Sequence, residues 1–386
     1  MPRIPRELHA SILIPTRARP HHLAACLAGL ARQHGLDGAG AEVIVAIDSP
    51  DPGDESAEAA ERAWRDAQAS SSLSLRIETL APPTDARATH GCVGVRNLLA
   101  PGCRGSVFVS INDDVRPEPG FLAAHLARHA ARAARRQPPA IIVGDSRFAP
   151  LAELCAPNDP PTLADRLVTE TGLVFFYDAM TSGPSDADRD WGYRHAFGLN
   201  VSLPRHALLG AGGYTHALAP YGYEDIELAH RLREAFGSPV LYDPDARAPH
   251  HHRYRPDDLL RREQALGRAA RAFAEACPSF ARDLFRTDLA DPATLAHYRE
   301  AVERDRADAE RQTHAWHALE RTPAGCVTGE PGDQQRVLQA LADGLRLVRR
   351  WRWRLGVLEQ AEAMTGDDAQ KPRLQERARP ARALRA

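Results

Sequence analysis

The stretch that decides the fold reads VFVSINDD and covers residues 107–114. Its apolar residues predict a strand that is buried on both faces, as in a parallel sheet. The polar residues Asn112, Asp113 and Asp114 follow at its carboxyl end. Ligands of open α/β sheets bind outside the carboxyl ends of the strands, and oxygen ligands there suit Mg²⁺ or Mn²⁺. The alternative is a plain polar turn, because Asn and Asp are ordinary turn residues.

On either side of this stretch, apolar runs alternate with helical patterns. Further strands are expected at residues 11–15, 42–47, 73–80, 140–143, 197–203 and 240–242. Between the first two, Leu23, Cys26, Leu27 and Leu30 recur at helical spacing. This alternation predicts an α/β fold with a Rossmann-like, doubly wound and mostly parallel sheet.

Beyond Pro256 the chain changes to long helical segments rich in Arg and Ala. Helices are expected at residues 259–276, 294–320 and 334–364, the last two as an antiparallel hairpin. We therefore predict an α/β domain over residues 1–254, a C-terminal α-helical appendage over 255–370 and a basic, disordered tail over 371–386. Arginines and tryptophans interleave over 349–354, which we interpret as a basic edge with Trp in the seam of the hairpin rather than a membrane-surface stretch.

The overall composition excludes several classes of protein. The 386 residues carry a net charge of −2, which argues against nucleic acid as a partner. The six cysteines are scattered without a CxxC motif, as expected for free thiols in a reducing compartment. From the sequence we expect neither a signal peptide nor a transmembrane helix. A cytoplasmic protein is expected, and peripheral contact with the inner face of a membrane is left open.

Four sequence blocks carry a resemblance to a known family. They are ILIPTR at 12–17, VIVAID at 43–48, VRN at 95–97 with the 107–114 stretch, and GLN at 198–200 leading through GGY at 212–214 to YEDIEL at 223–228. In this order and spacing, residues 11–252 resemble glycosyltransferase family 2, whose members have the GT-A fold and use nucleotide sugars. The helical region lies outside the resemblance.

The resemblance implies which residues bind the nucleotide sugar. These are Pro15, Thr16, Arg17, Arg19, Asp48, Arg96, Asn97, Asn112 and Asp113. Asp48 would accept a hydrogen bond from the base edge, while Arg96 and Asn97 would contact base or diphosphate. The chain departs from the family at Asn112, where Asp is usual, and at Ala18, where many relatives carry Asn.

The metal ligands implied by the resemblance are Asp114 and His250, for Mn²⁺ or Mg²⁺ as cofactor. A run of three histidines such as residues 250–252 is more often a solvated loop. In an extended chain His250 and His252 share one face, so His252 is the reserve ligand.

The general base implied by the resemblance is Asp225, with Glu224 beside it. Both open a helix, where carboxylates are also favoured for purely structural reasons. Trp191, Asn200 and Tyr223 are expected at the acceptor site. An indole ring packs well on a sugar face, but ordinary core packing of Trp191 is an equal alternative.

These observations predict a metal-dependent, inverting glycosyltransferase. By resemblance the donor is a UDP-sugar, and the acceptor is a hydroxyl-bearing glycan or glycoconjugate in polysaccharide or glycoconjugate synthesis. One alternative is a nucleotidyltransferase, which has no need of the 224–225 carboxylates. The other is a non-catalytic sugar- or partner-binding module, which Asn112 favours. Oligomerisation through the C-terminal helices is left open.

Overall fold

The computed structural model describes residues 9–36, 39–49, 51–67, 73–83, 90–181, 188–215 and 221–367. The tail predicted for residues 371–386 lies outside this range.

Seven strands form one sheet in the order β3-β2-β1-β4-β6-β5-β7. Their bounds are β1 Ala10–Thr16, β2 Ala41–Asp48, β3 Leu73–Leu80, β4 Val107–Ile111, β5 Ile141–Gly144, β6 Asn200–Pro204 and β7 Val240–Asp243. All pairings are parallel except those of β6, which runs antiparallel to both β4 and β5. The prediction of a mostly parallel α/β sheet is therefore confirmed.

The reversed direction of β6 gathers polar loops at one edge of the sheet. Because β6 runs against β4, its first residue, Asn200, pairs with Ile111, the last residue of β4. The amide of Asn112 extends this contact by donating to the carbonyl of Leu199 at 3.2 Å. The loop before β6 thus lies beside the loops that follow the parallel strands, and we call this side of the sheet the carboxyl edge.

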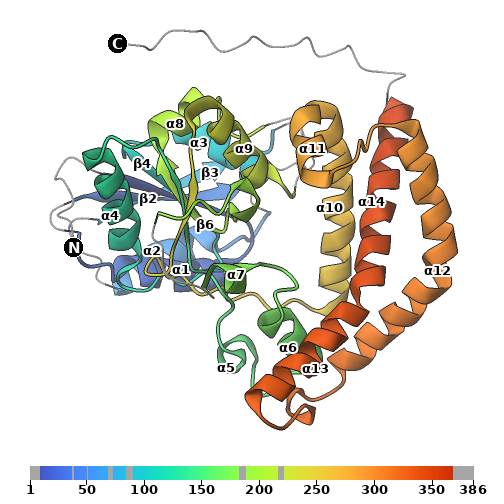
Figure 1. The fold of residues 1–386 in the computed structure, drawn as a ribbon. Helices are drawn as coiled ribbons and strands as arrows, with labels where there is room; N and C mark the ends of the chain where they lie inside the picture. The colour runs from blue at the N-terminus through green and yellow to red at the C-terminus, as the bar shows by residue number, and fades with distance from the viewer. Residues whose placement is uncertain are drawn as a thin grey trace.

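Helices cover the sheet and complete its core (Figure 1). In the first half of the chain they are α1 Pro20–Ala31, α2 Ser56–Asp66, α3 Gly91–Leu99 and α4 Phe121–Ala134. The later ones are α5 Leu151–Leu154, α6 Leu163–Glu170, α7 Tyr177–Thr181, α8 Arg205–Gly210 and α9 Glu224–Phe236. The residues of β1, β2 and β4 are buried on both faces, which explains their continuous apolar sequences.

The C-terminal helices are α10 Pro256–Ala276, α11 Pro278–Phe285, α12 Pro292–Glu320, α13 Pro331–Gly344 and α14 Arg346–Asp367. Figure 1 shows α10, α14 and α12 side by side, next to the sheet body. The prediction of a single helix over residues 334–364 is wrong, because the helix is interrupted between Gly344, the end of α13, and Arg346, the start of α14. The amide of Val348, in the first turn of α14, is capped by the side chain of Gln312 from α12 at 2.9 Å. This contact stabilises the start of a separate helix.

The predicted hairpin is also incomplete, because α14 packs on α10 as well as on α12. Two glycines permit the close approach of α10 and α14. A Cβ on Gly267 would collide with the carbonyl of Trp353, and one on Gly356 with the carbonyl of Gln264.

The tryptophans of the 349–354 stretch lie in the helical seam, as predicted. Trp351 donates to the carbonyl of Val302, and Trp353 donates to the hydroxyl of Tyr223. No helix in the described part of the chain is long and apolar enough to cross a membrane.

Candidate functional site

Two aspartates lie buried at the carboxyl end of β4. Asp113 accepts a hydrogen bond from Thr16 Oγ1 at 2.7 Å, which links the ends of β4 and β1. Arg19 spans the pair, with Nη1 2.7 Å from Asp113 Oδ1 and Nη2 2.9 Å from Asp114 Oδ2. The structure therefore brings together three residues that the sequence analysis assigned to the donor site, but Arg19 holds the acidic pair.

The two aspartates differ in their pKa. Burial raises the pKa of Asp113 to about 6, against the opposing effect of Arg19. Burial would also raise the pKa of Asp114, but His250 and Arg19 outweigh it and hold that pKa well below its usual range. Asp114 is therefore the permanently ionised member of the pair.

Two histidines from the loop after β7 face Asp114. His250 Nε2 lies 3.5 Å from Asp114 Oδ1, and His252 Nδ1 lies 3.6 Å from Asp114 Oδ2. The two imidazole rings are stacked nearly parallel, so they share a face as predicted. The ring of His250 is fixed from behind by Phe148, which stacks on it at 5.1 Å.

These residues fit a divalent metal that arrives with a phosphate ligand. Among the described residues, no three His, Cys, Asp or Glu side chains are grouped to hold a metal by themselves. However, Asp114 Oδ1 is buried and has no hydrogen-bond partner in the described part of the chain, and His250 faces it. Mg²⁺ commonly uses one or two carboxylates and takes its remaining ligands from water and substrate phosphates. Asp114 and His250 supply such a partial set.

Asp225, the predicted base, opens α9 and is held by a buried arginine. Arg96 Nη1 lies 3.2 Å from Asp225 Oδ1, and its Nη2 donates to the carbonyl of Gly198 at 3.4 Å. Burial raises the pKa of Asp225 to about 7, with Arg96 lowering it and Glu224 raising it. Arg96 itself is only 2% exposed. In this structure Arg96 orients the carboxylate of Asp225, and its predicted contact with the donor stays a prediction.

Two features of the backbone support this carboxylate. Gly198 lies against it so closely that any Cβ there would collide with Asp225. Tyr223, just before α9, has a left-handed φ of 66°, and such strain in a non-glycine residue is often found at functional sites. Glu224 accepts from the amide of Gly222 at 2.8 Å, so it stabilises the turn before the helix. The sequence blocks contained Gly198, but only the structure reveals its close contact with Asp225.

Two of the residues assigned to nucleotide binding, Asp48 and Asn97, form hydrogen bonds within the chain. Asp48 accepts the amides of His90 and Gly91 at 3.0 and 2.8 Å, and so caps the start of α3. Asn97 pairs with both the amide and the carbonyl of Tyr214, each at 2.8 Å. Asn97 thus holds the backbone of Tyr214, which directly follows Gly212 and Gly213.

The remaining predicted donor residues lie on or near β1 and β4. Pro15 is buried within β1, and Asn112 is half-buried beyond β4. Arg17 reaches the loop after β2, with Nη2 3.1 Å from Asp51 Oδ1. Between Arg17 and Arg19, Ala18 has a left-handed φ of 50°, a conformation that Asn tolerates better than Ala.

The three predicted acceptor residues do not form a common surface. Asn200 is fully buried, and it bonds to His125 Nε2 and to the carbonyl of Ala246. Tyr223 faces the helical region, where Trp353 donates to its hydroxyl. The side chains of Asn200 and Tyr223 thus have partners within the chain, and their acceptor roles stay predictions. Trp191 is half-buried on the core, and Arg189 covers its ring at 3.9 Å.

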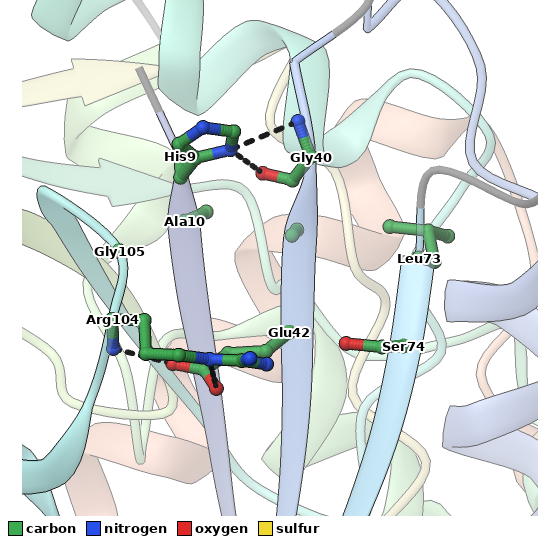
Figure 2. Close-up of a pocket in the computed structure, with 9 residues that line it drawn as sticks. His9, Ala10, Gly40, Glu42, Leu73, Ser74, Arg104 and Gly105 are labelled. Carbon is green, nitrogen blue, oxygen red and sulfur yellow. Dashed lines mark hydrogen bonds and ion pairs between the residues drawn. The ribbon is translucent and has the colours of Figure 1, made fainter. Parts of the chain in front are cut away.

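The opposite edge of the sheet also has a pocket, of about 350 Å³, at the amino ends of β1, β2 and β3 (Figure 2). Its buried carboxylate, Glu42, accepts from Ser11 Oγ, the Arg104 amide and Arg104 Nε at 2.6, 2.6 and 2.9 Å. His9 Nδ1 lies 3.2 Å from both the amide and the carbonyl of Gly40. Its polar groups thus bind one another, which indicates a structural role.

Comparisons with known proteins find distant likenesses to solved structures. No protein-family model matches the chain, and no curated protein matches it. The structure of the mannosyltransferase PcManGT from Pyrobaculum calidifontis, in complex with GDP-Man and Mn²⁺, is 14% identical over 94% of this chain and 76% of its own, with a TM-score of 0.45. S. aureus TarS is 14% identical over 69% of this chain, which spans only 42% of TarS, with a TM-score of 0.41. TarS 1-349 in complex with UDP-GlcNAc is 13% identical over 86% of this chain and 91% of its own, also at 0.41.

Proposed function

We propose that the chain is a metal-dependent, inverting glycosyltransferase of the GT-A type. It moves a sugar from a nucleoside diphosphate sugar, a UDP-sugar by resemblance, to a hydroxyl group of a glycan or glycoconjugate. Residues 1–254 form the transferase domain in this proposal, and residues 255–370 an appended helical region. The observation that carries the proposal is Asp225, a carboxylate with a pKa of about 7 at the same edge of the sheet as the acidic pair. A general base works best when its pKa is near the operating pH.

The proposed reaction is a single displacement. The acceptor hydroxyl oxygen attacks the anomeric carbon, and its proton passes to the carboxylate of Asp225. The bond between the anomeric carbon and the diphosphate oxygen breaks, and the nucleoside diphosphate leaves with the electron pair on the opposite face. One displacement inverts the anomeric centre. Arg96 keeps the carboxylate oriented, at 3.2 Å.

Charge balance supports a metal at Asp114. When both aspartates are ionised, Asp113, Asp114 and Arg19 sum to one negative charge, which repels a diphosphate. A further cation is needed, and Asp114 Oδ1 with His250 Nε2 would hold it. A divalent metal in this position would neutralise the charge that develops on the leaving diphosphate.

The test is calorimetric titration of UDP into the full chain, with Mn²⁺ and separately with EDTA. We expect binding to be much weaker in EDTA. UMP is the matched control, because it lacks the second phosphate and should gain less from Mn²⁺. An equal affinity for UDP in both conditions would contradict the metal role.

A second measurement separates an enzyme from a binding module. Each of several UDP-sugars is incubated with the protein and Mn²⁺, and the UDP that is released as the sugar passes to water or to an added glycan is measured. Tight binding of UDP without release from any of the sugars would favour the non-catalytic alternative.

A further inference from the structure

A second cavity, of about 380 Å³, lies at the carboxyl edge beyond β5. We call it the β5–α6 pocket, because residues of the loop after β5 and of helix α6 line it. Its lining includes Arg147, Phe148, Thr169, Phe175, Tyr177 and Arg247. A cavity of this size falls within the range of small-ligand sites. None of these residues belongs to the donor, metal or base groups described above.

Buried hydroxyl groups lie near Asp145, and one of them, that of Tyr177, belongs to a residue that lines the pocket. Asp145 is 2% exposed and bonds to Arg147, whose Nη2 lies 2.9 Å from Asp145 Oδ2. The hydroxyls of Ser146, Tyr177 and Tyr242 are buried without a hydrogen bond of good geometry within the described residues, although Tyr177 lies beside Ser146 and Tyr242 beside Asp145. Buried polar groups are nearly always paired. The hydroxyl of Tyr177, a pocket-lining residue that is 2% exposed, can therefore take a further polar partner.

Aromatic rings form another wall and connect the pocket with the candidate active site. Phe148 lines the pocket and stacks on His250 at 5.1 Å. Tyr177 contacts Phe197 at 5.3 Å, and the next residue after Phe197 is Gly198, which lies against Asp225. One layer of rings thus separates the pocket from the metal and base residues. A ligand in the pocket would be near the reaction without taking part in it.

The charges of the pocket favour a neutral ligand. The lining carries two guanidinium groups and three carboxylates, of Asp145, Glu170 and Asp178. Arg147 and Arg247 both lie within 4 Å of Asp145, at 2.9 and 3.9 Å. Little positive charge is left to attract an anion. A polyhydroxylated ring can instead place its C–H face on the phenyl rings and its hydroxyls on Tyr177 and the ionic groups.

We propose that the β5–α6 pocket binds a neutral sugar unit of the acceptor, other than the unit whose hydroxyl reacts. The proposal rests on the proposed glycosyltransferase function. Binding energy from such a remote unit helps to hold the substrate in position for reaction.

The test is saturation-transfer NMR on the full chain, with glucose, galactose, mannose, N-acetylglucosamine and their disaccharides as probes. Thr169→Trp is designed to fill the pocket. Tyr177→Phe removes only the unpaired hydroxyl, so it should leave folding intact. Tyr242→Phe is its matched control, because that hydroxyl is also buried and unpaired but the residue does not line the pocket.

We expect at least one sugar to bind the native chain, with binding abolished by Thr169→Trp. Tyr177→Phe should weaken it roughly fivefold, the effect of one lost hydrogen bond, while Tyr242→Phe leaves it unchanged. Thermal unfolding of each variant shows whether the fold is kept. Absence of binding by every probe, or binding that Thr169→Trp and Tyr177→Phe leave unchanged, would overturn the proposal. So would tighter binding of inorganic phosphate in this pocket than of any sugar.

The proposed function is tested separately, by UDP titration of the same samples. Sugar binding that is lost while UDP binding is kept affects only the pocket. Failure of UDP to bind the native chain affects the glycosyltransferase proposal, whatever the sugars do.

Discussion

Both edges of the sheet have carboxylates beside arginines, but these carboxylates differ in how fully they are hydrogen-bonded. At the amino edge, Glu42 accepts three hydrogen bonds, from Ser11 and Arg104. At the carboxyl edge, Asp114 Oδ1 has no hydrogen-bond partner among the described residues. Asp225, at the same edge, has a pKa of about 7 and one arginine, Arg96, as its ion-pair partner.

The difference shows how structural and functional carboxylates can be separated. Burial would raise the pKa of Glu42, but its hydrogen bonds, first that from the Arg104 amide, hold the pKa below the ordinary value of 4.5. Glu42 therefore stabilises the fold. At the carboxyl edge Asp114 keeps one oxygen available to a ligand and Asp225, with a pKa of about 7, can take up a proton, whereas Asp113 and Asp48 are hydrogen-bonded. The predictions below test this contrast.

The largest effect is expected from Asp225→Asn. The amide keeps the shape of the side chain but cannot accept the proton, so the transfer rate should fall by roughly 10²–10⁴. UDP affinity should change little, because the acidic pair and Arg19 are unaltered. Transfer rate and UDP affinity are measured on the same preparation.

Glu224→Gln is the matched control, at the neighbouring position of the same helix. We expect a much smaller loss of rate, because Glu224 supports the turn at Gly222. Loss of transfer in Glu224→Gln with near-native transfer in Asp225→Asn would reverse the two roles. Native rates in both variants would contradict the proposed base.

The next largest effect concerns Arg96, which lowers the pKa of Asp225 from within the core. The base must be unprotonated, so kcat/KM should fall as pH drops through about 7. Arg96→Met removes the cation, so the midpoint should move upward by about one to three pH units. Arg96→Lys keeps the charge, so its midpoint should stay close to that of the native chain. An unchanged midpoint in Arg96→Met would show that another group titrates.

Glu42→Gln tests the amino edge. The amide cannot replace all three hydrogen bonds, so the free energy of unfolding should fall by about 1–3 kcal/mol. The transfer rate per folded molecule should stay the same. Because the pKa of Glu42 is lowered in the folded state, its contribution is present above pH 4.5 and is lost as pH falls through the lowered value. Glu78→Gln on β3 is the control. Its pair with Arg76 is partly exposed, so the change should stay within about 0.5 kcal/mol. A large rate loss in Glu42→Gln would break the contrast between the edges.

Local sequence was sufficient for the strands but not for the pairing of side chains. Strands such as 107–111 were predictable because burial on both faces leaves a continuous apolar run. The break near Leu345 was not, because it depends on Gln312, which is 36 residues away from the amide it caps. The partner of Asp225 was missed for the same reason, as Arg96 lies 129 residues earlier. A sequence block can show that an arginine is needed without showing which group it contacts.

Asp48 is the residue that most directly challenges the contrast, because it lies at the carboxyl edge but is engaged like Glu42. Its two oxygens cap α3, the helix that carries Arg96 and Asn97. Asp48→Ala should therefore cost about 0.5–2 kcal/mol of unfolding free energy, whereas Asp48→Asn, which keeps a capping oxygen, should cost less. If the cap is its whole role, the preference for UDP over GDP should be the same in both variants as in the native chain. If Asp48 also reads the base, as the family resemblance implies, Asp48→Asn should reduce that preference while keeping most of the stability. Chemical unfolding and calorimetric titration of the two nucleotides distinguish these outcomes, because the first follows the helix and the second follows the ligand.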